Sequence, residues 1–412
     1  DKGTQYIEGM AGLWCTSLGF NEKRLAAAAT KQLESLPFMH TFAHRSTAPA
    51  IELAERLVDI APNGISKAFF VNSGSEAVDT AIKFVWYYHN AIGKPNKKKI
   101  ISRTGGYHGV TIAAGSLTGL PYVHQGFDLP AIGVLHTGHP HYYRFAEGEE
   151  SEEAFASRLA GNLDKLIQEE GPDNIGAFIA EPVMGAGGVI IPPRTYFEKI
   201  QAVLKKYDIL MIADEVICGF ARTGNMWGSE TYNIQPDMMT CAKQLSSAYV
   251  PIGAVLLTDQ IYQAFTKGSD QYGTFGTGNT YGGHPVAAAV ALETLNIYQE
   301  RNIVEHVRQM GERFEARLKG ISEHPLVGET RSAGLIGGLT IVEDKSSKKL
   351  FSPDVKAAPK IVEQILKNEL MLRPLPNDAI GICPPLIINE KEVDILFDRI
   401  EHGLDDAMPL LT

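Results

Sequence analysis

Short apolar runs alternate with amphipathic segments between about residue 65 and residue 260. Glycine, proline, serine or an acidic residue follows each run within a few positions, as is usual for buried strands. The predicted strands cover residues 68–71, 99–102, 177–180 and 209–213. Between them, apolar positions recur at helical spacing, as in the stripe Ala77, Ala81, Val85 and Tyr88. Alternating strands and helices predict an α/β fold, in which helices cover both faces of a mostly parallel sheet.

The pattern changes near residue 284, where longer helical segments begin. Helices are predicted over residues 284–300 and 302–318, and a smaller α+β region follows them. That region is predicted to hold strands at 335–342, 370–373 and 380–383 and helices at 355–368 and 390–407. Because 412 residues exceed the length at which a single core stops growing, we expect two domains. The predicted large domain spans residues 45–300, and residues 1–44 and 301–412 form the small one.

Composition and charge narrow the class of protein. Apolar residues make up 44% and charged residues 21% of the chain, as in ordinary globular proteins. The formal charge of -10 argues against a nucleic-acid-binding surface, which needs a basic stripe. No apolar run is long enough to span a bilayer and no secretory leader is visible, so a cytoplasmic location is predicted. Residues 6–8 already resemble a strand edge, which leaves open whether further residues precede them.

Several polar and reactive residues are expected to have structural roles. The four cysteines have apolar or glycine neighbours and no CxxC spacing, so we expect buried thiols. The acidic stretch at residues 147–153 is predicted to be a solvated loop. Arg222 is predicted to be a structural ion-pair partner. No metal site is predicted.

Lys243 carries the most informative chemistry. A buried strand at residues 209–213 ends in Asp214, and a second segment at residues 237–242 leads directly to Lys243. Ligands bind at the carboxyl ends of strands in α/β sheets. A lysine there can form a Schiff base with an aldehyde cofactor, while a carboxylate holds a ring nitrogen. The pair therefore indicates pyridoxal phosphate (PLP), although Asp-Glu at a strand end is also typical of a helix-capping pair.

Other motifs are compatible with the same cofactor but each has an alternative. Residues 73–75 (Ser-Gly-Ser) suit a phosphate at a helix N-terminus, or serve as an ordinary N-cap. Tyr107 lies in a glycine-rich loop where its ring could stack on a cofactor, or be buried in a turn. The glycines at 185–188 only weakly suggest a dinucleotide loop. Arg373 has the planar fork that suits a substrate carboxylate.

These motifs together resemble the class III (ω-) aminotransferases of PLP fold type I, over essentially the whole chain. The motifs that carry the resemblance are at residues 11–14, 73–77, 106–109, 181–182, 214–220, 242–243, 280–285 and 383–386. The resemblance implies a large domain with a mostly parallel seven-stranded sheet between helices, and a small α+β domain. It also implies a homodimer or a dimer of dimers, with active sites at the subunit interface.

The resemblance assigns roles to individual residues. Lys243 would form the Schiff base and move the proton, Asp214 would pair with the pyridine nitrogen, and Glu181 would orient groups beside the ring. Binding of the cofactor would involve Ser73, Gly74, Ser75, Tyr107, His108, Asp214, Val216 and Lys243, with Thr280 from the partner subunit. Binding of the substrate would involve Trp14, Phe42, Tyr107 and Arg373.

Three positions depart from relatives and bear on the substrate. Thr277 and Asn279 replace residues that are commonly histidine and apolar or aromatic. Ala186 stands where γ-aminobutyrate (GABA) and ornithine aminotransferases place a glutamate that pairs with the arginine. We therefore expect an amine or ω-amino acid donor, a keto-acid acceptor that is pyruvate, and ping-pong transfer. The alternatives are a 2-oxoglutarate-dependent aminotransferase, a PLP decarboxylase or aminomutase, a nicotinamide-dependent dehydrogenase and a non-catalytic binding protein.

Overall fold

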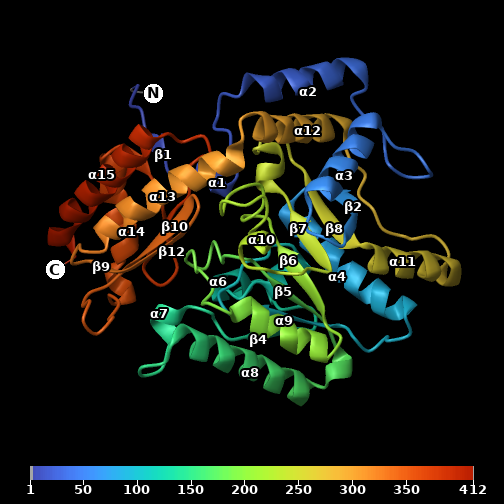
Figure 1. Cartoon of the computed structure of the whole chain (residues 1–412), viewed down its shortest axis with the longest axis horizontal. Helices are drawn as coiled ribbons and strands as arrows, with labels where there is room; N and C mark the ends of the chain where they lie inside the picture. Colours follow the sequence, from blue (N-terminus) through green and yellow to red (C-terminus); the bar gives the residue numbers. More distant parts are fainter. Residues whose placement is uncertain (1–2, 412) are drawn as a thin grey trace.

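A seven-stranded sheet forms the centre of the computed structural model, which describes residues 3–411 (Figure 1). Its order is β2 (Ile65–Val71), β8 (Gly253–Thr258), β7 (Met238–Cys241), β6 (Leu210–Asp214), β5 (Ile175–Ala180), β3 (Lys99–Arg103) and β4 (Val134–Thr137). Strand β8 is antiparallel to both of its neighbours, and the other neighbouring pairs are parallel. The mostly parallel sheet that the sequence predicts is therefore confirmed.

Both faces of this sheet are buried, which explains why its strands are continuous apolar runs. In β5, Ala177 and Ile179 belong to the core under α4 (Gly74–Ala91) and α11 (Asp259–Tyr272). The alternate residues, Phe178 and Ala180, belong to the opposite core. That core includes α8 (Glu152–Glu170), α9 (Tyr196–Lys206) and α12 (Pro285–Glu300). Successive side chains of a strand thus anchor helices on opposite faces.

The C-terminal part forms a second, antiparallel sheet beyond the long helix α13 (Ile303–Ile321). Its order is β12 (Arg373–Leu375), β13 (Ala379–Ile382), β10 (Ile336–Ile341) and β9 (Val327–Ala333). Helices α14 (Ala357–Lys367) and α15 (Glu390–Ala407) pack beside it (Figure 1). The predicted strand at 370–373 is two short strands, β11 (Leu370–Met371) and β12, separated by Leu372.

The N-terminal segment contacts both parts of the molecule. Strand β1 (Ile7–Glu8) pairs in parallel with β11, which confirms the predicted strand edge and ties it to the C-terminal region. Helix α2 (Lys23–Ser35) instead lies along α12, and α3 (Ala48–Ile60) follows it there (Figure 1). The division into domains at residues 45 and 300 remains a prediction.

Two expectations about charged residues need correction. The acidic stretch at 147–153 is not only a loop, because Ser151 caps α8 and Glu152 and Glu153 form its first turn. Acidic residues favour that position because the amides of a first helical turn are unpaired. Arg222 is buried, but it donates to the carbonyl oxygens of Leu335 (2.9 Å) and Pro384 (2.6 Å), and no ion pair of Arg222 occurs in the described part of the chain.

All four cysteines are free thiols, three of them buried and Cys15 half-buried. Within residues 3–411, no helix combines the length and apolar character needed to cross a membrane.

Candidate active site

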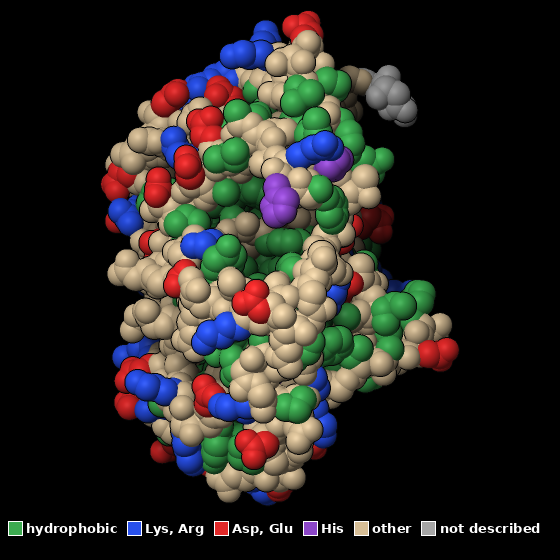
Figure 2. Space-filling model, turned by 90° about the vertical axis from the view of Figure 1, so that its right-hand side faces the viewer, with side chains coloured by type: hydrophobic (Ala, Val, Ile, Leu, Met, Phe, Trp, Pro, Cys, Tyr) green, Lys and Arg blue, Asp and Glu red, His purple; other side chains and the backbone are tan. Residues whose placement is uncertain are grey.

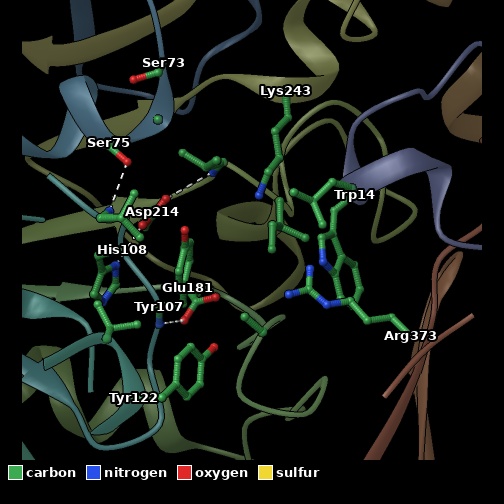
Figure 3. Close-up of a pocket in the computed structure, with 18 residues that line it drawn as sticks. Trp14, Ser73, Ser75, Tyr107, His108, Tyr122, Glu181, Asp214, Lys243 and Arg373 are labelled. Atoms are coloured by element: carbon green, nitrogen blue, oxygen red, sulfur yellow. Dashed lines mark hydrogen bonds and ion pairs between the residues drawn. The ribbon is translucent and has the colours of Figure 1, made fainter. Parts of the chain in front are cut away.

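The largest concentration of predicted site residues lines one cavity of about 330 Å³. It lies where β3, β5, β6 and β7 end, at the edge of the sheet where α/β proteins bind ligands. In Figure 3, Asp214 and His108 occupy one side of the cavity and Trp14 and Arg373 the other, with the amine of Lys243 between them. The sheet therefore brings together residues that are far apart in the sequence.

Asp214 is the last residue of β6, and its carboxylate is almost fully enclosed. Oδ2 lies 2.7 Å from Nδ1 of His108, and Oδ1 accepts from the Thr240 hydroxyl at 3.1 Å and the Val216 amide at 3.2 Å. Thr240 is directly opposite Asp214 in the pairing of β6 with β7. These donors compensate the burial of the negative charge and fix the direction of the carboxylate.

Glu215, the next residue, points away from the cavity. Its carboxylate accepts from the amides of Gly228 (3.0 Å) and Ser229 (2.6 Å) and from the Ser229 hydroxyl (2.5 Å). Gly228 begins the short helix α10 (Gly228–Thr231). The helix-capping alternative is thus correct for Glu215, whereas Asp214 faces the cavity.

Lys243 begins the turn after β7 and has a left-handed backbone (φ 46°). Burial lowers the pKa of its amine, and the charges of Asp214 and Glu181 oppose that effect in part. No hydrogen bond or ion pair of Nζ is recorded in the described part of the chain. A lowered pKa leaves more of the amine neutral near pH 7, the form that acts as nucleophile or base.

The residues at the start of α4 divide into two functions. Ser73 caps the helix, because its Oγ accepts from the Glu76 amide at 3.1 Å, so the N-cap alternative holds for this hydroxyl. The Ser75 hydroxyl accepts from the Val110 amide at 3.2 Å. A Cβ at Gly74 would lie 3.0 Å from Val216, so the absence of a side chain lets Val216 approach the helix. The free amides of this helix N-terminus suit an anion.

Glu181 connects two loops beneath the cavity. Its Oε1 accepts from the amide of Tyr107 and its Oε2 from that of Gly185, each at 3.0 Å. Burial raises the pKa of this carboxyl. Tyr107 is half-buried and lines the cavity, and the glycines at 185–188 form a tight turn, with Met184 and Ile190 bridged across it. That turn places Ala186 in the cavity wall.

Trp14 and Arg373 form the wall that belongs to the N- and C-terminal segments. The Trp14 side chain is buried and lines the cavity. Arg373 also lines it, and within residues 3–411 no hydrogen bond or ion pair of its guanidinium is recorded. Two predicted residues, Phe42 and Thr280, do not line the cavity of their own chain. Phe42 is 45% exposed and packs on Gly278. Gly278 and Thr280 belong to the same exposed loop.

Some lining residues were not predicted from the sequence. These are Leu13, Gly109, Val110, Tyr122, Val123 and Ile217. Leu13 and Ile217 adjoin predicted site residues, so sequence proximity could have indicated them. Thr240 does not line the cavity but could have been found by aligning the two predicted strands beside Asp214. Tyr122 and Val123 had no local signal, because only the fold brings the short helix α6 (Pro121–His124) to the cavity.

The donor set of this cavity fits pyridoxal phosphate. An unpaired lysine amine of lowered pKa suits an aldehyde, an enclosed carboxylate suits a pyridine nitrogen, and a helix N-terminus suits a phosphate. Within the described residues, no cluster of three or more His, Cys, Asp or Glu side chains could hold a metal ion. Fold and cavity together define a PLP-dependent transferase.

Comparison with known proteins specifies the family. The family model described as "Aminotransferase class-III" matches residues 1–404, so the chain belongs to the class III aminotransferases. It is 53% identical over 407 residues to gamma aminobutyrate transaminase 3, chloroplastic, of Solanum lycopersicum, covering 98% of this chain and 78% of that protein. It is 54% identical over 396 residues to the mitochondrial transaminase 1 of the same plant, covering 96% and 77%.

Solved structures agree with this result. A structure described as "Transaminase with L-ala" matches with a TM-score of 0.98 and 53% identity, over 100% of this chain and 97% of that one. The omega transaminase from Pseudomonas jessenii in complex with PMP matches with a TM-score of 0.97 and 53% identity, over 99% and 90%. The predicted family, fold, cofactor and amino-group transfer are therefore confirmed. The cytoplasmic location stays a prediction, because the plant relatives are named chloroplastic and mitochondrial.

Proposed function

We propose that this aminotransferase moves the amino group of an ω-amino acid or an amine to pyruvate by a ping-pong mechanism. The main support for pyruvate as the acceptor comes from Arg373. This residue lines the cavity, and its guanidinium has no acidic partner among the described residues. Ala186 lines the same cavity, and the resemblance places at this position the glutamate that pairs with the arginine in GABA and ornithine aminotransferases. A free guanidinium suits the carboxylate of a small keto acid.

Two similarities support the substrate pair. One matching structure is described as a transaminase with L-alanine, which is the amino-acid counterpart of pyruvate. The plant relatives are named for γ-aminobutyrate, which is an ω-amino acid. Both names describe those proteins. Arg373 supports the same substrates for this chain, because its guanidinium can bind the carboxylate that pyruvate and ω-amino acids share.

The residues of the cavity have distinct proposed tasks. Lys243 would hold the cofactor covalently, Asp214 would hold its ring nitrogen, and the start of α4 with Ser75 would hold its phosphate. Tyr107 and Val216 would flank the ring, and His108 would support Asp214. When bound, the cofactor supplies an aldehyde that takes up the amino group and a ring that accepts electrons.

Proton transfer falls to Lys243. Its amine lies in the cavity with a pKa lowered by burial, so the neutral form can take a proton from the substrate carbon. Glu181 holds the Tyr107 loop in place through its hydrogen bond to the Tyr107 amide. Positioned acid–base catalysis of this type contributes ~10²–10⁴-fold to rate.

The acceptor can be identified from half-reactions of the protein loaded with PLP. The visible absorbance band is bleached with β-alanine, γ-aminobutyrate or 1-phenylethylamine, and the donor is then removed. Pyruvate should restore the band at least about tenfold faster than 2-oxoglutarate at equal concentration. Equal or faster recovery with 2-oxoglutarate would overturn the proposed acceptor while leaving the donor result intact.

A homodimer is the proposed assembly. Figure 2 shows hydrophobic side chains gathered around a hollow on one face of the molecule. A second apolar cavity adjoins the active-site cavity and shares Val110, Tyr122 and Val123 with it. Phe127 and Ile112 in this second cavity are 72% and 69% exposed, which is unusual for large apolar side chains of a monomer.

Subunit complementation tests this assembly and the role of Thr280 together. Lys243→Ala and Thr280→Ala chains are denatured, mixed and refolded, or coexpressed with different tags. A mixed dimer has one site with both Lys243 and the partner's intact Thr280, so activity should exceed that of either variant alone. Light scattering should give the mass of at least two chains. A monomer, or a mixture no more active than its components, would contradict the proposal.

A further inference from the structure

The segment between β1 and the cavity has an unusual backbone. Ala11 and Trp14 both have positive φ angles, 46° and 63°, although neither is glycine. Such conformations cost free energy and persist where surrounding contacts fix them. The segment also carries Trp14, the large apolar side chain of the cavity wall.

Glu8 supplies contacts that fix this segment. Its Oε1 accepts from the Met10 amide at 2.9 Å, and its Oε2 accepts from the Gly12 amide. The Trp14 amide in turn donates to the Met10 carbonyl at 2.9 Å. A single carboxylate thus satisfies two amides of the turn whose last residue is Trp14.

Glu8 is itself anchored to β11, the short strand that ends two residues before Arg373. It pairs with Met371 in the register of β1 and β11. The adjacent Gly9 donates to the Met371 carbonyl at 3.0 Å and accepts from the Cys383 amide at 2.7 Å. The Trp14 turn is therefore hydrogen-bonded to β11, which directly precedes the strand of Arg373.

The indole of Trp14 packs against Gly381 of β13, where there is no side chain to obstruct it. Gly381 is opposite Arg373 in the pairing of β12 with β13. A Cβ at Gly381 would lie 2.9 Å from Cη2 of Trp14, closer than such contacts normally occur. Figure 3 shows Trp14 and Arg373 next to each other on the wall that faces Lys243. The position of the indole therefore sets the width of the cavity beside the arginine.

We propose that Glu8 is a positioning residue for substrate size: its carboxylate holds the Trp14 turn, and Trp14 then limits the bulk of the amine donor. This inference rests on the proposed role of Trp14 in the substrate pocket. Glu8 lies outside the cavity lining, so it acts through Trp14. Its loss should change which donor is preferred more than it changes the maximum rate with a small donor.

The test compares kcat/KM for a bulky donor, 1-phenylethylamine, with that for a small one, β-alanine, with pyruvate as acceptor. Glu8→Gln keeps the shape of the side chain but replaces one acceptor oxygen by an amide that repels N–H donors. The bulky-to-small ratio should rise about tenfold, the scale expected when a pocket changes size. Glu22→Gln is the matched control, since Glu22 also accepts from the amide two residues on (3.2 Å), far from the cavity. It should leave the ratio unchanged.

A double-mutant cycle separates positioning from general stability. Trp14→Ala should raise the ratio by itself, and Glu8→Gln should add nothing in the Trp14→Ala background. Gly381→Ala offers an independent test of the Trp14 position, because its methyl group would collide with the indole and should change the ratio. Visible absorbance verifies that each variant binds the cofactor.

The outcomes distinguish this inference from the proposed function. If Trp14→Ala leaves the ratio unchanged, or the parent uses neither donor, the substrate pocket itself is wrongly assigned. If Trp14→Ala raises the ratio but Glu8→Gln does not, or if Glu8→Gln has the same effect with and without Trp14, the role of Glu8 is overturned. If Glu8→Gln does not fold, Glu8→Asp, which keeps the carboxylate on a shorter side chain, takes its place in the same comparison with and without Trp14.

Discussion

Nδ1 of His108 lies 2.7 Å from Oδ2 of Asp214, and both residues are buried and line the cavity. The second ring nitrogen of His108, Nε2, has no hydrogen-bond partner in the described residues. Within residues 3–411, Asp214 is therefore the hydrogen-bond partner of the imidazole. His108 also lines the cavity, so its role in cofactor binding, which the resemblance implies, stays a prediction.

Replacing His108 should slow amino-group transfer without preventing cofactor binding. His108→Phe removes the donor to the buried Asp214, a loss of about 1–3 kcal/mol that corresponds to about tenfold to a hundredfold in rate. His108→Asn carries an amide donor in a similar place and should lose less. Stopped-flow bleaching of the visible band measures both. Equal rates in His108→Phe and the parent would refute the supporting role.

Lys243→Ala should abolish steady-state transamination while the fold remains intact. The amine of Lys243 lies in the cavity and burial lowers its pKa, so it can transfer the proton. Without it, the rate should fall by at least the ~10²–10⁴-fold typical of acid–base catalysis. Lys206→Ala, which removes an exposed amine paired with Asp164, is the control and should retain activity. Circular dichroism monitors folding. Measurable turnover by Lys243→Ala would exclude the assignment.

Arg373→Ala should raise the KM for pyruvate by about tenfold to a hundredfold, because a hydrogen bond to a charged group contributes about 1.5–3 kcal/mol. The half-reaction with 1-phenylethylamine, which has no carboxylate, should stay within a few-fold of the parent. The two half-reactions are measured separately in single-turnover experiments. Similar losses in both would indicate that Arg373 supports the cavity rather than the acceptor.

Ala186→Glu should weaken pyruvate binding by adding an acid to the cavity that Arg373 lines. Ala186→Gln is nearly the same size without the charge, so the difference between the two variants isolates the electrostatic effect. The KM for pyruvate should be higher in Ala186→Glu than in Ala186→Gln. Indistinguishable values would mean that the absence of a glutamate does not determine the acceptor.

Glu215 should make the protein less stable as the pH rises. Burial raises the pKa of Glu215 from the usual 4.5 to about 7, so the folded state holds this proton more tightly than the unfolded state. The free energy of unfolding should therefore decrease between about pH 4.5 and pH 7 by a total on the order of 3 kcal/mol. Above that range the effect of Glu215 is constant. Glu215→Gln does not titrate and should lack this dependence.

Apparent melting temperatures at one scan rate, from pH 5 to pH 8, measure this effect as the difference between parent and Glu215→Gln. The variant should gain relative to the parent as the pH rises. A difference that is constant with pH would show that Glu215 does not titrate in this range.

The sequence alone determined the α/β class, the main strands and helices, and the pair Asp214 and Lys243. Buried parallel strands must be apolar on both faces, so residues such as 177–180 are recognisable without knowledge of their neighbours. Polar residues at strand ends meet at one edge of the sheet, which makes the lysine–aspartate site predictable. Local spacing also predicted the edge strand at residues 6–8 and offered the cap at Ser73 as one of two alternatives.

Only the tertiary structure decided how the remaining side chains are used. Asp214 and Glu215 are adjacent acids that the sequence alone does not distinguish. In the structure, Asp214 faces the cavity and Glu215 accepts from the amides of α10, because successive side chains point in opposite directions. The prediction of an ion pair for Arg222 was wrong, because its guanidinium donates to backbone carbonyls of segments that are distant in the sequence. The close approach of Trp14 to Gly381 joins residues at opposite ends of the chain. Such contacts arise when the sheets pack, and no local pattern encodes them.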